Sequence, residues 1–301
     1  MTERMAIQIQ GLTKSYGRVR ALRGLDLEVG QSEIMGFLGP NGAGKTTTIR
    51  CLLDLIRPDA GRARVLGIDP QADPVAVRRR TGYLPGELHL YDNLTAERQL
   101  RYLNALRGGQ ADWNYVRQLA QRLDLDLKRP IKNLSKGNKQ KVGVIQALMH
   151  RPELLILDEP TSGLDPLVQR EVMSLLRDAH AGGATVFFSS HVMSEVEALA
   201  ERVGIIRQGR LVEVAATSAL GHRTLRRVRI TFQDPVDSAA LADVPGVKLI
   251  EREDDIGLLL QVAGDLNPLI QALGSLPVRD LETEHPSLEE VFLAYYEADS
   301  K

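Results

Sequence analysis

Cysteine is almost missing from this sequence, since Cys51 is the only one among 301 residues. A single thiol cannot form a disulfide bond within the chain, nor can it supply a zinc site made of several cysteines. Cys51 stands beside Leu52 and Leu53 on the apolar face of a predicted helix. We therefore expect it to pack in a core and to take no part in chemistry.

The sequence also lacks an excess of charge of one sign. Lysine and arginine total 38 against 39 aspartate and glutamate residues, which gives a formal net charge of -1. Proteins that bind nucleic acid favour strongly basic faces. The balance of charge therefore argues against nucleic acid as a partner.

Long apolar runs are missing too, because no stretch approaches the roughly 20 residues that a membrane-spanning helix needs. The first residues, MTERMAIQIQ, lack the charged start, apolar middle and cleavage site of a signal peptide. We expect a cytoplasmic chain. If it serves a membrane, a separate chain must cross the bilayer.

Apolar residues make up 43% of the sequence, enough for one large domain and a smaller one. Over residues 1–217, short β-branched apolar runs alternate with amphipathic helical stretches, as in an α/β layered domain. Unbroken apolar runs predict strands buried on both faces of a parallel sheet at Ile34–Leu38, Leu154–Asp158 and Thr185–Ser190. Residues from about 95 to 150 predict a helical insert.

The remaining residues, 218–301, predict a smaller accessory domain. Charged and apolar residues alternate over 226–232 as in a half-buried strand. The elements expected after it are a helix at 238–241, strands at 247–250 and 258–262, a helix at 269–273 and a strand at 278–281. This βαββαβ order predicts an α+β domain of the ferredoxin-like type. Ser287 and Glu290 form a capping pattern that predicts a last helix.

The segment GPNGAGKT, residues 39–46, has the glycines and lysine of a phosphate-binding loop at the required spacing. Glycines let successive backbone N–H groups surround the phosphates, and the following helix adds the positive end of its dipole. Lys45 is expected to reach the β- and γ-phosphates of ATP, and the Thr46 hydroxyl to bind Mg²⁺. The alternative is a turn that only joins strand to helix, but a lysine followed by three threonines suits packing poorly. The expected nucleotide contacts are Gly39, Pro40, Asn41, Gly42, Ala43, Gly44, Lys45, Thr46 and Thr47.

Two acidic residues, Asp158 and Glu159, stand at the carboxyl end of a predicted strand, where open α/β sheets bind ligands. Asp158 is expected to hold Mg²⁺ directly or through water. Glu159 is expected to orient or deprotonate the water that attacks the γ-phosphate. An acidic pair after a strand can also cap a helix, but its combination with the phosphate-binding loop favours catalysis.

The segment LSKGNKQ, residues 134–140, resembles the signature loop of the nucleotide-binding subunits of ABC transporters, although Lys136 and Asn138 depart from the common form LSGGQ. In that family two subunits stack head to tail. The signature serine and glycine of one subunit touch the γ-phosphate held by the other, which implies these roles for Ser135 and Gly137. By itself the segment could also be an ordinary helix cap.

Three further motifs follow in the order of this family. SGLD, residues 162–165, resembles the loop that crosses the dimer interface and implies a nucleotide-site role for Asp165. His191 matches the switch histidine that contacts the γ-phosphate, and Tyr16 resembles the aromatic residue that stacks on adenine. Each signal is weak alone, because a lone histidine at a strand end is more often a surface residue and a lone tyrosine more often packs.

One position departs from the family pattern. The segment GYLPGELHLY, residues 82–91, places Gly86 where the family usually offers a glutamine, and glycine cannot bind Mg²⁺ through a side chain. Our hypothesis is that Glu87 or a water takes over. The apolar side chains of this segment either face a permease helix or belong to the core of the insert. They are Leu88, Leu90 and Tyr91.

The resemblance covers roughly residues 7–214 and implies a P-loop ATPase with a helical insert. Such a subunit dimerises around two MgATP and drives a separate membrane permease from the inner face of the cell membrane. The segments GYLPGELHLY and PSLEEVFLAYY look like those of subunits that serve exporters of drugs, antibiotics, lipids or polysaccharides, so we expect export. We expect residues 218–301 to steady or regulate the dimer.

Other functions are weighed against this one. A soluble ABC-type ATPase that acts on nucleic acid or ribosomes typically carries coiled-coil insertions, zinc modules or two cassettes, and the sequence has none of them. A small-molecule kinase would transfer phosphate to an acceptor other than water, but the signature loop and His191 argue against it. A purely regulatory role would require a dead site, yet Lys45, Asp158, Glu159 and His191 are all present.

Overall fold

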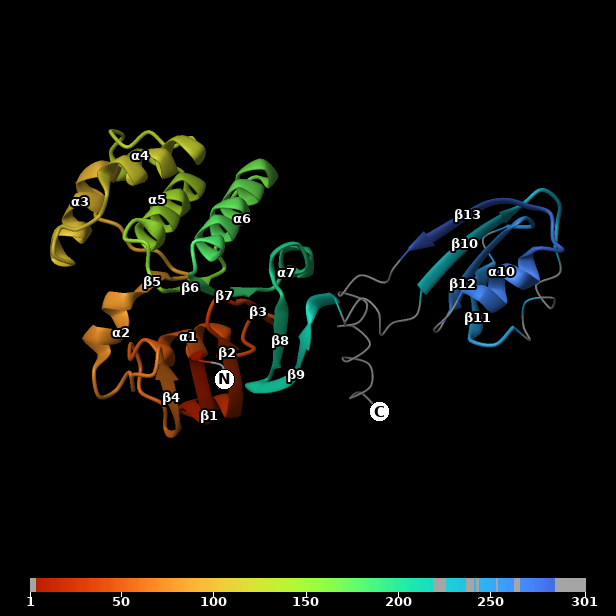
Figure 1. Ribbon diagram of the computed structural model, residues 1–301, viewed down its shortest axis with the longest axis horizontal. Helices are drawn as coiled ribbons and strands as arrows, with labels where there is room; N and C mark the ends of the chain where they lie inside the picture. Colours follow the sequence, from red (N-terminus) through yellow and green to blue (C-terminus); the bar gives the residue numbers. More distant parts are fainter. Residues whose placement is uncertain are drawn as a thin grey trace. The chain divides into compact units, whose positions relative to one another are not determined.

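The structure is a computed structural model that describes residues 4–218, 226–236, 241, 244–252, 254–262 and 266–284. The chain divides into two compact units, Met1–Ala215 and Ala216–Lys301 (Figure 1). Across the described residues, no helix combines the length and the apolar character needed to pass through a bilayer.

A six-stranded sheet lies at the centre of the first unit, in the order β5-β6-β7-β3-β8-β9. Its strands are β3 (Ile34–Leu38), β5 (Thr81–Leu84), β6 (Leu154–Asp158), β7 (Thr185–Ser190), β8 (Arg202–Arg207) and β9 (Arg210–Ala216). The neighbours from β5 to β8 pair in parallel. Every residue of β3, β6 and β7 is buried, which confirms that the three apolar runs are strands covered on both faces.

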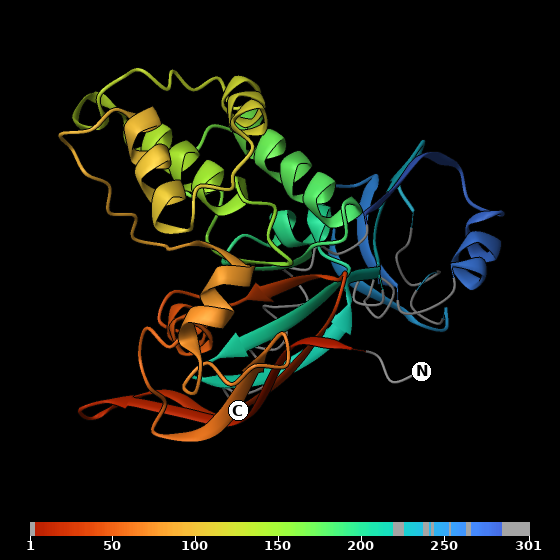
Figure 2. The same cartoon turned by 60° about the vertical axis from the view of Figure 1, so that its left-hand side comes forward.

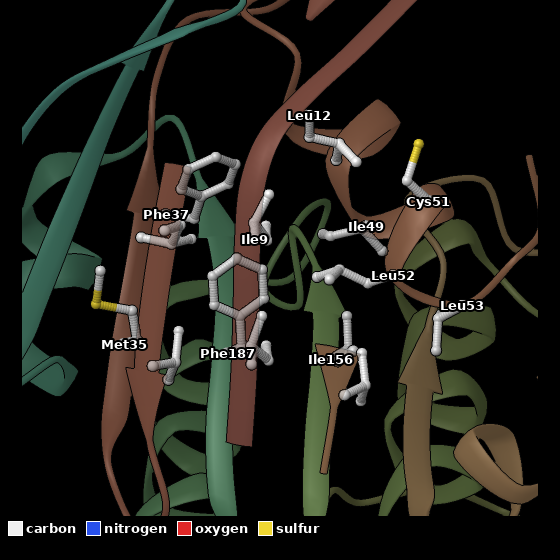
Figure 3. Close-up of a cluster of buried hydrophobic side chains, with 14 of the residues drawn as sticks. Ile9, Leu12, Met35, Phe37, Ile49, Cys51, Leu52, Leu53, Ile156 and Phe187 are labelled. Atoms are coloured by element: carbon white, nitrogen blue, oxygen red, sulfur yellow. The ribbon is translucent and has the colours of Figure 1, made fainter. Parts of the chain in front are cut away.

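A three-stranded antiparallel sheet, in the order β2-β1-β4, contributes to the same core. Its strands are β1 (Met5–Tyr16), β2 (Val19–Gly30) and β4 (Ala60–Val65), and helix α1 (Lys45–Leu52) follows β3. Ile9 from β1, Phe37 from β3, Ile49 from α1 and Phe187 from β7 belong to one buried cluster (Figure 3). The antiparallel sheet and the parallel sheet thus share their hydrophobic packing through α1.

Cys51 belongs to this cluster, and only 3% of its surface is exposed (Figure 3). Burial raises the pKa of its thiol to about 11, so the thiol stays protonated at neutral pH. The expectation that Cys51 packs in a core is confirmed.

The helical insert lies beside the parallel sheet, where α3, α4 and α5 group together in both views (Figure 1, Figure 2). Polar caps set the start of two of its helices, because Thr95 Oγ1 accepts from the N–H of Arg98 and Asp112 Oδ1 accepts from the N–H of Asn114. The further helices of this unit are α2 (Pro74–Arg80), α3 (Ala96–Leu106), α4 (Trp113–Arg122), the 3₁₀ turn Ile131–Asn133, α5 (Lys136–Leu148), α6 (Pro166–Ala181) and α7 (Met193–Leu199).

The second unit contains a four-stranded antiparallel sheet in the order β11-β12-β10-β13. Its elements are β10 (Arg226–Phe232), β11 (Val247–Arg252), β12 (Gly257–Val262), α10 (Asn267–Leu273) and β13 (Val278–Glu284). The alternation along β10 places Val228, Ile230 and Phe232 in the core of this unit. The first and third strands lie in the middle, as in a ferredoxin-like sheet.

Two helices predicted for this unit fall mainly outside the residues that the structure describes. Of the helix expected at 238–241, only Leu241 is described, and it is helical. The helix expected after Ser287 lies outside the described residues altogether.

Parallel pairing brings the carboxyl ends of β3, β6 and β7 to one edge of the sheet. In the register of this sheet, Leu38 pairs with Ser190 and Asp158 pairs with Ser189. The loops that follow the three strands therefore begin beside one another, at the edge where open α/β sheets bind ligands.

Candidate functional site

The loop between β3 and α1 requires glycine at specific positions. A Cβ at Gly39 would lie 2.4 Å from the carbonyl oxygen of Ile206, and a Cβ at Gly44 would lie 2.8 Å from that of Ala21. Gly42 and Gly44 have φ angles of 80° and 113°, which side chains of other residues rarely permit. Helix α1 starts at Lys45 without a side-chain cap. Its first N–H groups are therefore suited to an anion.

Lys45 is held across this loop, and only 5% of its surface is exposed. Its Nζ donates to the carbonyl oxygens of Gly39 at 2.5 Å and Pro40 at 3.3 Å, and lies 3.5 Å from Oε1 of Glu159. Burial lowers the pKa of this ammonium group, while the carboxylate of Glu159 opposes that shift. A phosphate that replaced the two carbonyl contacts would add negative charge beside this buried ammonium group.

Asp158 receives a hydrogen bond on each of its carboxylate oxygens. Thr46 Oγ1 donates to Oδ2 at 2.7 Å, and Ser189 Oγ donates to Oδ1 at 2.6 Å. Only 1% of Asp158 is exposed. Sequence reasoning missed Ser189, although a serine near the carboxyl end of a buried apolar strand was a signal for it.

The donor set around Asp158 fits magnesium. Hydroxyl and carboxylate oxygens are the ligands that Mg²⁺ prefers, and it is usually held by one or two carboxylates together with phosphates and water. The described part of the chain contains no group of three or more histidine, cysteine, aspartate or glutamate residues that could hold a metal by themselves. Thr46 and Asp158 therefore suit an ion that arrives with a nucleotide.

Glu159 and His191 meet directly, because Nδ1 of His191 lies 3.0 Å from Oε1 of Glu159. This is the same glutamate oxygen that faces Lys45. Glu159 has a φ angle of 52°, and its N–H donates to both the carbonyl oxygen and the side-chain oxygen of Ser189. The strained turn after β6 thus aims the glutamate at the lysine and the histidine.

Gln140 was not assigned a role from the sequence, yet it holds the loop that contains Glu159. Its Nε2 donates at 3.2 Å to the carbonyl oxygens of both Glu159 and Pro160. Because Gln140 lies in α5, this contact joins the helix that begins within the signature loop, residues 134–140, to the loop after β6 that contains Glu159. No local pattern predicts such a contact, since it joins distant segments.

One cavity of about 430 Å³ collects most of the predicted nucleotide contacts. Tyr16, at the end of β1, borders it with 48% of its surface exposed. Arg20, Arg23 and Gln208 also line it, and no motif in the sequence pointed to them. The predicted residues that line it are Tyr16, Pro40, Asn41, Gly42, Gly44, Lys45, Thr46, Thr47 and Glu159. Gly39 and Ala43 belong to the same loop but are buried and do not line the cavity.

Five other predicted residues lie outside the lining of this cavity: Asp158 and His191, whose contacts are given above, and Ser135, Gly137 and Asp165. Ser135 Oγ accepts from the N–H of Asn138 and caps α5, and Asp165 Oδ1 accepts from two N–H groups at the start of α6. A Cβ at Gly137 would lie 3.0 Å from the carbonyl oxygen of Gly163, so the signature segment packs on the SGLD segment of the same chain. The roles of Ser135, Gly137 and Asp165 at a nucleotide site stay predictions.

Gly86 lies against the candidate metal site. A Cβ at Gly86 would lie 3.0 Å from Oδ2 of Asp158, the oxygen that accepts from Thr46. The neighbouring Glu87 is exposed. Position 86 therefore borders the site but offers no side chain to it.

The apolar residues after Gly86 divide between the two alternatives. A Cβ at Gly143 in α5 would lie 2.7 Å from Leu88, so Leu88 packs on the insert. Tyr91 is 55% exposed and its ring packs edge to face on that of Tyr102. Leu88 thus serves the core, whereas Tyr91 is available to a partner.

Comparisons with known proteins match both parts of the chain. The family model of ABC transporters matches residues 22–162, and the model of the C-terminal domain of DrrA1-3-like ATP-binding proteins matches residues 222–296. The daunorubicin/doxorubicin resistance ATP-binding protein DrrA of Streptomyces peucetius is 34% identical over 305 residues, covering 96% of this chain and 92% of that protein. The bacitracin transport ATP-binding protein BcrA of Bacillus licheniformis is 38% identical over 240 residues, covering 79% of this chain and 78% of that protein.

Solved structures share this architecture over about 70% of the chain. A structure of the ATP-binding subunit of an ABC transporter has a TM-score of 0.66 and 29% identity, and covers 71% of this chain and 91% of that chain. The dimeric structure of MJ0796, a bacterial ABC transporter cassette, has a TM-score of 0.65 and covers 70% of this chain and 98% of that chain. Its identity is 22%, so this second likeness concerns the fold alone.

Proposed function

This chain belongs to the ATP-binding subunits of ABC transporters, and we propose that it acts as a homodimer that hydrolyses MgATP to drive a separate export permease. The observation that carries the proposal is the convergence of Lys45, Glu159 and His191. Lys45 Nζ and His191 Nδ1 lie 3.5 Å and 3.0 Å from the same carboxylate oxygen of Glu159. A cation, a base and a histidine are thus gathered beside the phosphate-binding loop.

The chemistry assigned to these residues is attack by water on the γ-phosphate. Lys45 turns to the β- and γ-phosphates and offsets their negative charge. Glu159 orients the water and accepts its proton, because it lines the cavity beside Lys45. His191 holds Glu159 in place and contacts the γ-phosphate.

Thr46 and Asp158 are assigned to Mg²⁺, which binds together with the nucleotide. The fit of their oxygens supports this assignment. The ion supplies positive charge at the phosphate oxygens during the transfer. Ser189 keeps the Asp158 carboxylate oriented toward Thr46.

A second copy of the chain completes each site in this proposal. Ser135, Gly137 and Asp165 lie outside the cavity of their own chain, whereas the start of α5 presents a serine hydroxyl and N–H groups typical of an anion site. We assign these residues to the nucleotide held by the partner copy. Residues 1–217 form the ATPase domain, and residues 218–301 form an accessory domain that steadies or regulates the dimer.

The permease partner is assigned to a groove of about 820 Å³ between α2, α3 and the end of α5. Leu55, Val75 and Leu106 are 45%, 61% and 67% exposed there. Arg78 and Arg79 also line the groove. This combination suits an amphipathic, acidic segment of a membrane protein, which would hold the chain at the inner face of the cell membrane.

The cargo proposed for the transporter is an antibiotic or a similar drug-like compound. The names of the relatives support this class, since two of them refer to daunorubicin and doxorubicin and to bacitracin. A third, from Bacillus subtilis, is 31% identical over 301 residues and is named for linearmycin resistance. Lipid or polysaccharide export is the second candidate from the sequence, but no observation on the structure favours it.

The deciding experiment measures steady-state ATP hydrolysis by purified wild type and Glu159→Gln over a range of protein concentrations, with light scattering to follow dimers. We expect hydrolysis per subunit to rise with protein concentration in the wild type. The variant should bind ATP and dimerise, but hydrolyse at a rate lower by at least about 100-fold. Equal hydrolysis by both proteins would refute the assignment of Glu159.

A further inference from the structure

Glu195 is a buried carboxylate that the chemistry described so far does not use. It lies in the first turn of α7, and only 8% of its surface is exposed. Its two oxygens accept hydrogen bonds from two hydroxyl groups, Oε1 from Thr161 Oγ1 and Oε2 from Ser190 Oγ at 2.7 Å. A charged group is costly to bury unless hydrogen bonds satisfy it, and these two hydroxyl groups satisfy Glu195. What requires an explanation is why a carboxylate stands at this buried position.

The two donors stand on two different loops, and each is next to a candidate catalytic residue. Thr161 follows Glu159 by two positions on the loop after β6. Ser190 immediately precedes His191 at the end of β7. The carboxylate of Glu195 therefore joins the loop that carries the glutamate to the loop that carries the histidine.

Further contacts make this connection stiff. The hydroxyl of Ser190 accepts from the N–H of Val192 while it donates to Glu195, so its orientation is set from both sides. Thr161 is 4% exposed, and the N–H of Leu164 donates to its carbonyl oxygen. Glu159, His191, Thr161, Ser190 and Glu195 all line one small cavity of about 200 Å³.

We propose that Glu195 is a positioning residue for ATP hydrolysis, which sets the distance between Glu159 and His191 by holding Thr161 and Ser190 together. The contact of 3.0 Å between Glu159 and His191 closes the ring that these hydrogen bonds begin. Displacements of about 1 Å at reacting groups are enough to slow an enzyme strongly. This inference rests on the proposed ATPase function, because it concerns the geometry of the same site.

The test compares full-length Glu195→Ala and Glu195→Gln with wild type in steady-state hydrolysis of MgATP. Glu195→Ala should lower kcat at least about tenfold and change KM by less than about twofold, because the phosphate-binding loop is untouched. Glu195→Gln should keep at least about half of kcat, since an amide can accept from one hydroxyl and donate to the other. Ser194→Ala, at an exposed position in the same helix, is the control and should behave as wild type.

A double variant separates positioning from a merely structural role. If Glu195 acts through His191, the loss in His191→Ala/Glu195→Ala should be at least about fivefold smaller than the product of the two single losses. A loss in the double variant equal to the product of the two single losses would overturn the inference. A fall in kcat accompanied by a rise in KM of the same size would overturn it too. If Glu195→Ala does not fold, Thr161→Val is measured in its place, because it removes one of the two donors to Glu195 at nearly constant volume. An unchanged kcat in Thr161→Val would again overturn the inference.

The same measurements distinguish this inference from the proposed function. A wild type that hydrolyses ATP and a Glu195→Ala variant that matches it would overturn the role of Glu195 alone. A wild type without hydrolysis at any protein concentration would overturn both.

Discussion

Thr46 Oγ1 donates a hydrogen bond of 2.7 Å to Oδ2 of Asp158, although 112 residues separate the two in the chain. The two oxygens meet because Thr46 follows the loop after β3 while Asp158 ends β6, and both strands run in parallel to the same edge of the sheet. Ser189 fixes the other oxygen of the carboxylate. The pair is therefore oriented before any ligand arrives.

Replacement of Thr46 by valine tests this pair. Valine keeps the branched shape but removes the hydroxyl, so the Mg²⁺ concentration for half-maximal hydrolysis should rise about tenfold, equivalent to about 1.4 kcal/mol. A titration of Mg²⁺ at constant ATP concentration measures this requirement through hydrolysis. A second titration, in the Glu159→Gln background, measures it through nucleotide binding. Thr231→Val, in a strand of the second unit, is the control, and an equal shift in both variants would contradict the assignment.

The hypothesis that Glu87 replaces the missing side chain at Gly86 stays a prediction. Glu87→Ala should raise the Mg²⁺ requirement several-fold if this carboxylate acts on the ion directly or through water. The same titration measures it, with Glu97→Ala in α3 as a control of equal charge change. An unchanged Mg²⁺ requirement and unchanged hydrolysis would leave water as the group that acts beside Gly86.

Tyr16 is expected to bind the base of ATP through its ring. Removal of an aromatic ring that stacks on a base costs about 1–3 kcal/mol, so Tyr16→Ala should weaken ATP binding about tenfold or more, whereas Tyr16→Phe should stay within about twofold of wild type. Equilibrium titration with a fluorescent ATP analogue measures the affinity. Tyr102→Ala is a matched control because Tyr102 and Tyr16 are 45% and 48% exposed. Equal affinities of Tyr16→Ala and wild type would refute stacking.

His150 should make the fold sensitive to acid. Burial and the guanidinium of Arg107, whose Nη2 lies 2.6 Å from Nε2 of His150, lower the pKa of His150 from 6.5 to about 4. Below about pH 6.5 the imidazole of His150 therefore binds a proton in the unfolded chain but stays neutral in the folded chain. The contribution of His150 to the free energy of unfolding is present above that pH and is lost as the pH falls toward about 4.

Urea unfolding at about pH 7 and about pH 4.5 measures this contribution. Glutamine cannot be protonated in this range, so His150→Gln should lose about 1–2 kcal/mol less free energy of unfolding than wild type between the two pH values. The exposed His89 offers the control His89→Gln, which should follow the wild type. Parallel curves for His150→Gln and wild type would contradict the prediction.

Cys51 should be inert in the folded protein. Its thiol is buried and its pKa is raised to about 11, so little thiolate forms and reagents cannot reach it. Iodoacetamide at about pH 8 should leave the native chain unmodified and should alkylate it fully in guanidinium chloride. Alkylation of the native chain at the rate of the unfolded chain would show that α1 opens or that the thiol is accessible.

Some features could be read from the sequence because they depend on local chemistry. The glycines and Lys45 of the phosphate-binding loop must stand at a set spacing, and the buried strands β3, β6 and β7 are mainly apolar. The alternation over 226–232 likewise predicts a strand with one buried face, which the structure confirms. The catalytic and binding roles of these residues stay predictions until the variants are measured.

Other features could not be read from the sequence, since they join distant segments. Ser189, Gln140 and Glu195 occupy ordinary positions in a strand and two helices, and only their contacts with Asp158, with the carbonyl oxygen of Glu159 and with Thr161 give them importance. The antiparallel sheet of β1, β2 and β4 was also missed, because its strands alternate imperfectly and carry register shifts.

The sequence by itself determined which chemical groups this protein has, because a phosphate-binding loop, an acidic pair and a histidine each require particular residue types. The tertiary structure alone decided which of them meet. Parallel pairing of β3, β7 and β6 places Lys45 Nζ and His191 Nδ1 at 3.5 Å and 3.0 Å from the same oxygen of Glu159. Ser135, Gly137 and Asp165 remain outside the lining of the nucleotide cavity of their own chain. Distances between groups far apart in the chain are set by strand register and packing, which no local pattern encodes.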